Sequence, residues 1–96
     1  MGAGEDRPRL VVNTYRIEFR PAALRELRKI DRSMQPRIQG AIALLAQDPR
    51  PPASRPLRGR EGYRLRVGDY RIIYTIDNGV LVIVVVTIGH RRDVYQ

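Results

Sequence analysis

The chain has 96 residues, enough for one domain with one modest core but not for two. Hydrophobic residues make up 43% of it, which argues against wholesale disorder, and the lack of cysteine excludes disulfides and thiolate chemistry. Eighteen basic residues against 10 acidic ones give a formal net charge of +8, a balance that indicates a polyanionic partner such as nucleic acid.

The sequence predicts one domain with an N-terminal tail and no membrane-spanning segment. Residues 1–12 show no periodicity, so we expect a flexible N-terminal tail there and a single domain over residues 13–96. The longest apolar run, residues 80–88, is far shorter than the roughly 20 residues of a membrane helix. No charged-then-apolar leader stands at the start, and a cytoplasmic protein without a membrane segment is the expectation.

A strand and two helices are predicted next. Residues 15–20 alternate apolar and charged side chains, which is typical of a half-buried strand. Pro21 opens a helix, whose predicted buried stripe is Leu24, Leu27 and Ile30. Ser33 is the predicted N-cap of a second helix. The predicted core face of this second helix is Met34, Ile38, Ala41, Ile42 and Leu45.

Four prolines between positions 49 and 56 favour an extended connection rather than a packed element, up to about Gly62. A β-hairpin is predicted to follow over residues 63–74, with Gly68 supplying the positive φ of a type II′ turn. Asp77-Asn78-Gly79 is a turn signal that leads into residues 80–88. This last run is apolar on both faces, so it must be covered on both sides or lie central in a sheet.

The predicted fold class is therefore α+β, in the order β-α-α-β-β-β. Two N-terminal helices are expected to pack on one face of a small, mostly antiparallel, four-stranded sheet. The tyrosines and alternate aliphatic residues of the hairpin should rest on the helices. Its arginines should then line the opposite face, beside Ile73 and Thr75.

The hairpin places like charges together. The predicted turn pairs Val67 with Tyr70, and Arg66 with Arg71, while Arg64 lies two residues further along. Like charges in a cross-strand pair are destabilising, and an anionic ligand such as a polyphosphate chain would resolve the conflict. The simpler alternative is a solvated sheet surface that carries no function.

Other polar residues follow the last strand. His90, Arg91, Arg92 and Tyr95 come directly after it, and guanidinium groups and aromatic rings are the groups that hold RNA phosphates and stack on unpaired bases. Cleavage by the RNA's own 2′-hydroxyl needs positioning, charge stabilisation and proton transfer. With one histidine and no acidic cluster at ligand spacing, no metal site or cofactor is predicted.

Four pieces of the sequence together resemble the RelE/ParE toxin superfamily, and most closely its RelE branch. They are Leu57-Arg58-Gly59, Tyr63 to Arg66, Gly68 to Tyr74 and Gly89 to Tyr95. The resemblance implies a toxin of a type II toxin–antitoxin system, neutralised by an acidic or amphipathic RelB-like antitoxin. It further implies a ribosome-dependent endoribonuclease that cuts mRNA in the ribosomal A site and leaves a cyclic phosphate.

The same resemblance implies roles for individual residues. Arg71 is similar to the family's phosphate-stabilising arginine, Arg91 to the arginine that protonates the leaving oxygen, and Tyr95 to the tyrosine that stacks on the cleaved nucleotides. Arg66 is expected among the catalytic residues as well. The residues expected to bind RNA are Arg58, Arg64, Arg66, His90 and Arg92.

Arg64 and Arg66 stand where well-studied members of the family have lysines, one of them proposed as the general base. Arginine effectively cannot lose its proton. Arg66 is therefore expected to stabilise the phosphate, and the base is left open among His90, Tyr95, a water and a ribosomal group.

Two other functions stay open. One is a ParE-like toxin that inhibits DNA gyrase without cutting RNA, because the same fold serves both branches. The other is a plain basic RNA-binding domain without toxicity.

Overall fold

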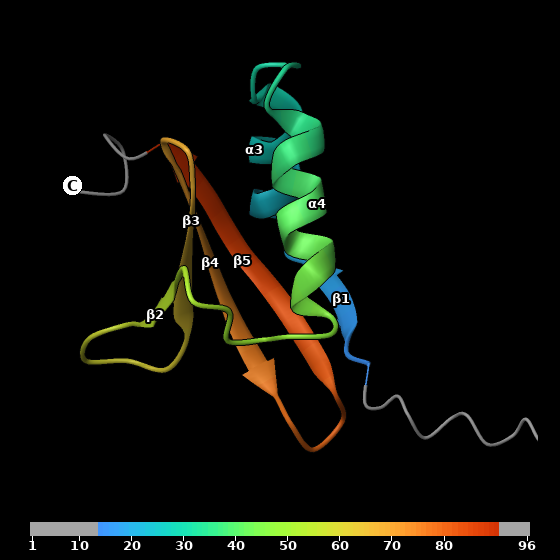
Figure 1. The fold of residues 1–96 in the computed structure, drawn as a ribbon, viewed down its shortest axis with the longest axis vertical. Coiled ribbons are helices and arrows are strands. Elements are labelled where there is room, and N and C mark those ends of the chain that lie inside the picture. The colour runs from blue at the N-terminus through green and yellow to red at the C-terminus, as the bar shows by residue number, and fades with distance from the viewer. Residues whose placement is uncertain (1–13, 91–96) are drawn as a thin grey trace, which may run out of the picture.

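The computed structural model describes residues 14–90, so the predicted tail over residues 1–12 lies outside the described part. Two helices cover one face of a single sheet with strand order β1-β5-β4-β3-β2 (Figure 1). The elements are β1 (Arg16–Phe19), α3 (Pro21–Lys29), α4 (Gln35–Leu45), β2 (Ser54–Pro56), β3 (Tyr63–Val67), β4 (Tyr70–Asp77) and β5 (Val82–His90). The predicted α+β class, helix placement and mostly antiparallel sheet are confirmed.

The sheet has a fifth strand where the sequence predicted only a connection. Ser54–Pro56 pairs antiparallel with β3, with Ser54 opposite Leu65 and Pro56 opposite Tyr63. The prolines favour extended backbone, as predicted, and extended backbone beside an open strand edge can form a ladder. Proline is tolerated because β2 is the outermost strand and its outer edge needs no donor.

The helices begin and face slightly differently from the prediction. Pro21 opens α3 as expected, but Leu24 is 37% exposed and Ala23 is fully buried in its place. The cap at Ser33 is wrong, since α4 begins at Gln35 and the Ser33 hydroxyl bonds to the Asp31 carboxylate instead. Gln35 joins the two helices, because its side-chain amide donates to the Ile30 carbonyl at 2.8 Å.

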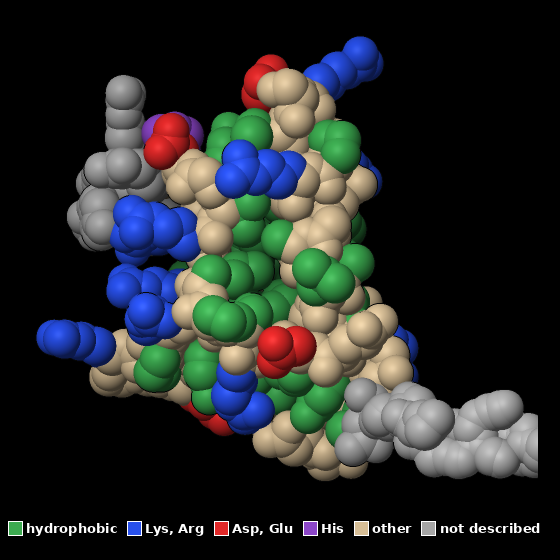
Figure 2. Space-filling view, viewed as in Figure 1, with side chains coloured by type: hydrophobic (Ala, Val, Ile, Leu, Met, Phe, Trp, Pro, Cys, Tyr) green, Lys and Arg blue, Asp and Glu red, His purple; other side chains and the backbone are tan. Residues whose placement is uncertain are grey.

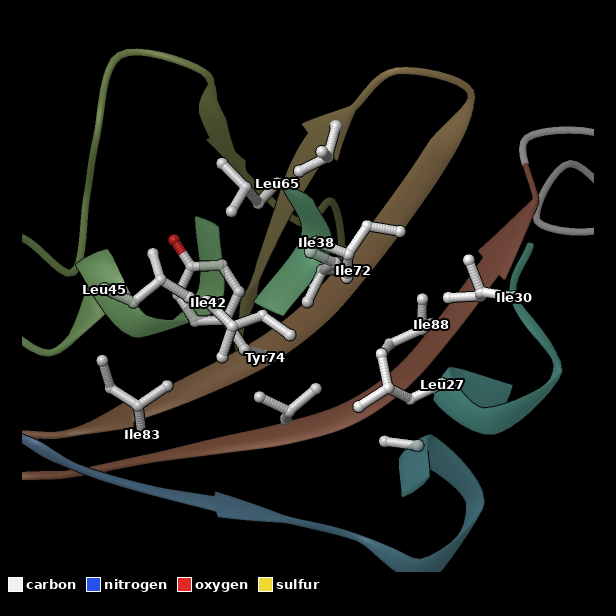
Figure 3. Packing of buried hydrophobic residues seen from close by; sticks show 13 residues of the cluster. Leu27, Ile30, Ile38, Ile42, Leu45, Leu65, Ile72, Tyr74, Ile83 and Ile88 are labelled. Atoms are coloured by element: carbon white, nitrogen blue, oxygen red, sulfur yellow. The ribbon is translucent and has the colours of Figure 1, made fainter. Parts of the chain in front are cut away.

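One hydrophobic core lies between the helices and the sheet (Figure 3). The predicted face of α4 is confirmed, with Ile38, Ile42 and Leu45 buried and Met34 and Ala41 packed against them. The labelled side chains in Figure 3 come from both helices and from β3, β4 and β5, and they point toward one another. Among the described residues no helix is both long and apolar enough to cross a membrane.

The hairpin between β3 and β4 has the predicted register. Arg66 pairs with Arg71, and Val67 pairs with Tyr70. Gly68 has a φ of +60° and Asp69 has no positive φ, which matches the type II′ pattern. Because a two-residue turn fixes which residues stand opposite each other, the arginine pair follows directly from the turn.

The apolar strand β5 is internal, as predicted, between β1 and β4. It begins at Val82 rather than Val80, after Leu81, a non-glycine residue with a positive φ of +57°. A β-bulge interrupts its pairing with β4, where Thr87 is opposite Ile73 and Val85 is opposite Tyr74. The residue between them, Val86, is the extra one, so the side-chain alternation reverses beyond it.

Candidate nucleic-acid interface

The sheet face turned away from the helices carries a pocket made almost wholly of arginines. It has a volume of about 260 Å³, and its lining residues are Ala53, Arg55, Arg64, Arg66 and Arg71. Figure 2 shows basic side chains gathered along the side of the molecule formed by β2 and β3. The three hairpin arginines predicted to share this face are therefore brought together.

The strand register forces these cations into opposition. Arg66 stands opposite Arg71, and Arg55 stands opposite Arg64. Within residues 14–90, neither Arg64 nor Arg66 forms an ion pair with an acidic side chain. Like charges opposite each other in a cross-strand pair are unfavourable, and a bound polyanion would reduce the repulsion around Arg64 and Arg66.

Arg71 is the buried member of the group. Its exposed fraction is only 7%, whereas Arg64 and Arg66 are exposed. Arginine is rarely buried to this degree. Burial lowers the local dielectric and strengthens the attraction of its guanidinium for an anion. Gly89 stands opposite Arg71 on β5 and adds no side chain to this part of the face.

Arg55 is a member of the pocket that the sequence prediction missed. It lies on β2, the strand that was expected to be an unpaired connection, so its position beside the hairpin was not predicted. The three residues of β2 are buried, exposed and exposed, which is not the alternation of a half-buried strand. The sequence of β2 therefore carries no local signal that would have placed Arg55 beside the hairpin.

A second pocket of about 480 Å³ adjoins the same face, and Arg58 lies there rather than with the hairpin arginines. Its lining residues are Glu26, Leu57, Arg58, Arg60, Ile73, Thr87, Ile88 and Gly89. The loop that carries Arg58 is closed by a hydrogen bond from the Leu57 amide to the Gly62 carbonyl at 2.9 Å. The pocket therefore has a mostly apolar floor from β4 and β5, two arginines from this loop at its rim, and one carboxylate from Glu26 on α3.

His90 does not join the arginines. It pairs with Tyr70 and contacts that ring edge-on, with 5.3 Å between ring centroids. Tyr70 packs against the core between sheet and helices, so the His90 side chain lies on the helix side of the sheet. It lines a separate pocket with Asp31, Met34, Arg37, Gly68, Asp69 and Tyr70.

Three predicted site residues, Arg91, Arg92 and Tyr95, lie outside the described residues. The described part of the site can hold phosphate through guanidinium groups, which suit its bidentate geometry. Among the described residues that line the arginine pocket there is no carboxylate or imidazole. Its chemistry is therefore charge stabilisation and positioning, and a proton acceptor has to come from another group.

Comparison with known proteins finds relatives of this chain by sequence and by fold. The family described as ParE toxin of type II toxin-antitoxin system, parDE, matches residues 17–95. A putative RelE-like toxin protein of Escherichia coli is 33% identical over 87 residues, covering 85% of this chain and 90% of the relative. Toxin RelG of Mycobacterium tuberculosis is 30% identical over 86 residues, covering 85% of this chain and 97% of the relative.

The fold leads to the same group. A chain in the crystal structure of the archaeal RelE–RelB complex from Pyrococcus horikoshii has a TM-score of 0.73 and 26% identity, with 81% of this chain and 96% of that chain covered. The sequence matches and the structural match each cover most of this chain and most of the relative. The chain belongs to the RelE/ParE superfamily of toxins from type II toxin–antitoxin systems.

Proposed function

We propose that the protein is a ribosome-dependent endoribonuclease that cuts mRNA in the ribosomal A site and so stops translation in the cytoplasm. The observation that carries the proposal is the pocket that joins Arg64, Arg66 and Arg71 on one exposed sheet face. Its position on the hairpin agrees with the residues that resemble the RelE site. A face of this charge suits a phosphate backbone, and the ribosome would present the strand to it.

The proposed reaction is attack by the RNA's own ribose. The 2′-oxygen forms a bond to the adjacent phosphorus while the bond from phosphorus to the 5′-oxygen breaks, which leaves a cyclic phosphate on the upstream piece. Arg71 and Arg66 would stabilise the negative charge that grows on the phosphate oxygens. By the family resemblance, Arg91 would give a proton to the departing 5′-oxygen. A guanidinium that stays protonated in water can do this because the departing alkoxide is the stronger base. Tyr95 would hold the nucleotides by stacking.

The proposal needs a group that accepts the proton of the 2′-hydroxyl. The sequence left His90, Tyr95, a water and a ribosomal group as candidates, and the proposal keeps fewer of them. Arg66 keeps its proton at any physiological pH. His90 lies on the helix side of the sheet, away from the arginine pocket. Tyr95, a water or a ribosomal group therefore takes this role in the proposal.

Substitution of Arg71 and Arg91 tests the proposal. Arg71→Ala and Arg91→Ala should each lower the rate of A-site cleavage at least 100-fold. The first removes charge stabilisation in the transition state, and the second removes the proton donor. The measurement is primer extension on mRNA-programmed ribosomes mixed with purified toxin. Arg25→Ala, which removes the same charge from an exposed position on α3, is the matched control. Wild-type cleavage by both site variants would refute the proposal.

We also propose a RelB-like antitoxin as the partner that neutralises the toxin. The similar archaeal structure is a complex of RelE with RelB, and a chain of formal charge +8 attracts an acidic or amphipathic segment. Neither Arg71→Ala nor Arg91→Ala should abolish this complex, since each removes one side chain from a large surface. Copurification of the variant toxin with a tagged antitoxin measures this.

A second candidate function is inhibition of DNA gyrase. It is favoured by one observation, the match of residues 17–95 to the family described as ParE toxin. Titration of purified toxin into a supercoiling reaction distinguishes the two candidates. Loss of supercoiling near one toxin per gyrase, with mRNA left intact on ribosomes, would favour the gyrase inhibitor.

A further inference from the structure

We propose that Arg55 binds a second phosphate of the RNA, next to the phosphate that reacts. This inference rests on the proposed function and extends its site by one residue on β2. The role is one of positioning: Arg55 would hold the strand in register, and the reacting phosphate would lie on the Arg66–Arg71 row.

The sheet register sets out two rows of arginines. Arg66 and Arg71 form one cross-strand pair, and Arg55 and Arg64 form the other. Arg64 and Arg66 are two residues apart on β3, so the rows are separated by about 7 Å along the strand. This separation is on the scale of the distance between neighbouring phosphates of an extended single strand. Each row can therefore receive one phosphate.

The Arg55 guanidinium is held in place before any ligand arrives. Its Nη1 donates to the Pro52 carbonyl and to the Ser54 carbonyl, each at 2.8 Å. A guanidinium has five N–H donors, and these two bonds use the pair on Nη1. Within the part of the chain that the structure describes, Nε and Nη2 make no hydrogen bond, so these donors can serve a ligand in the pocket that Arg55 lines.

The strand that carries Arg55 is itself fixed to the fold. Ser54 is 8% exposed, and both its amide and its hydroxyl donate to the Pro51 carbonyl, at 2.9 and 2.8 Å. Prolines at positions 51, 52 and 56 restrict the backbone on either side. A cation on a restrained strand loses little conformational freedom when it binds a phosphate.

A purely structural role for Arg55, in which it only links two loop carbonyls, explains its hydrogen bonds but not its position among other arginines. Such a tie needs donors but no charge, and here the charge stands directly opposite Arg64 in a pocket with two further arginines. That opposition is a cost to the free protein. Phosphate binding accounts for both the hydrogen bonds and the clustered charge.

Arg55→Ala separates the two roles by kinetics on mRNA-programmed ribosomes. The toxin concentration at half-maximal cleavage should rise about tenfold, as loss of one charge-assisted phosphate contact predicts. The rate at saturating toxin should change less than about twofold, because Arg55 does not touch the reacting phosphate. Arg55→Lys should recover most of the lost affinity, and Arg25→Ala should behave as wild type.

Binding to RNA without the ribosome gives an independent readout. The probe is a fluorescent hexaribonucleotide with 2′-O-methyl groups, which cannot be cleaved. Removing one phosphate contact should reduce the slope of log affinity against log salt by about 0.7, in Arg55→Ala and not in Arg25→Ala.

The possible results distinguish phosphate binding by Arg55 from a purely structural role. The inference is overturned if Arg55→Ala matches Arg25→Ala in both half-saturation and salt slope. It is also overturned if Arg55→Ala and Arg55→Lys lower the melting temperature equally and share the same loss of saturating rate, since that is the behaviour of a structural tie. A wild-type toxin that never cuts mRNA but shows the predicted salt-slope difference would refute the proposed function and keep the phosphate contact.

Discussion

Among single residues, Tyr74 shows most clearly how one polar atom is accommodated in the core. Its side chain is fully buried, and its hydroxyl donates to the Pro49 carbonyl at 2.6 Å. Burial raises the pKa of the Tyr74 phenol above its ordinary value. The unfolded chain then releases this proton at lower pH than the native state does, so ionisation favours unfolding.

The sign of this effect predicts loss of stability in alkali. Below about pH 10 the phenol is neutral in both states, and above it the free energy of unfolding should fall with rising pH. Tyr74→Phe should lower the free energy of unfolding at neutral pH by about 0.5–1.5 kcal/mol, because the part-buried hydrogen bond to the Pro49 carbonyl is lost. Its stability should then fall less steeply above about pH 10. Urea unfolding followed by circular dichroism measures both; parallel pH profiles would contradict the assignment.

Residue identity predicted part of the site well. Alternation along the hairpin was enough to place Arg64, Arg66 and Arg71 on one face, because a strand reverses its side chains at every residue. Arg55 could not be placed in the same way. Its membership depends on the pairing of β2 with β3, a contact that no local pattern specifies.

At the scale of elements, the loop between β2 and β3 depends on one glycine. Gly62 has a φ of +123°, and a Cβ built there would lie 3.0 Å from Leu57 Cδ1 and 3.1 Å from the Tyr74 carbonyl oxygen. Gly59 in the same loop has a φ of +73° but open space around it. An alanine at Gly59 would therefore meet backbone strain alone, whereas an alanine at Gly62 would meet strain and a steric conflict.

Gly62→Ala should cost about 2–4 kcal/mol of unfolding free energy, from strain and close contact together. Gly59→Ala should cost only about 1 kcal/mol, the strain alone. Denaturation midpoints in urea, with equal m-values, give the comparison. Equal costs for the two variants would show that the contacts around Gly62 relax freely.

The elements differ in how far the sequence alone predicts them. The β3–β4 hairpin followed from its two-residue turn, and the helices followed from their 3.6-residue periodicity. The start of α4 was missed because Ser33 bonds to Asp31, a local alternative that competes with capping. The bulge at Val86 was missed because it lies in a uniformly apolar run, where an extra residue leaves no mark in the pattern.

At the scale of the whole molecule, the sheet separates stability from function. The helices and the core lie on one side, and the arginine pocket lies on the other. Substitutions on the two sides should accordingly have different readouts. Core variants should lower the free energy of unfolding, whereas arginine-face variants should stay folded and lose the proposed activity.

Two alanine substitutions in α4, Ile38→Ala and Leu44→Ala, test where the core lies. Ile38 is fully buried and Leu44 is 66% exposed, although both belong to the same helix. Ile38→Ala should cost about 2–5 kcal/mol, a large share of the stability of a domain this size. Leu44→Ala should change stability by less than about 0.5 kcal/mol. Similar losses for both would contradict the placement of the core.

The bulge at Val86 decides which residues of β5 face the core and which face the arginine pocket. Ile83 and Val85 face the core before it, and Ile88 faces the core after it, so the spacing changes from two to three. Deleting this one residue would turn His90 toward the arginines and Ile88 toward solvent. After residue 86, an insertion or deletion within β5 keeps the same side chains toward the core only if it has an even number of residues. An odd step would place an ionisable imidazole among the guanidinium groups at the expense of a core side chain.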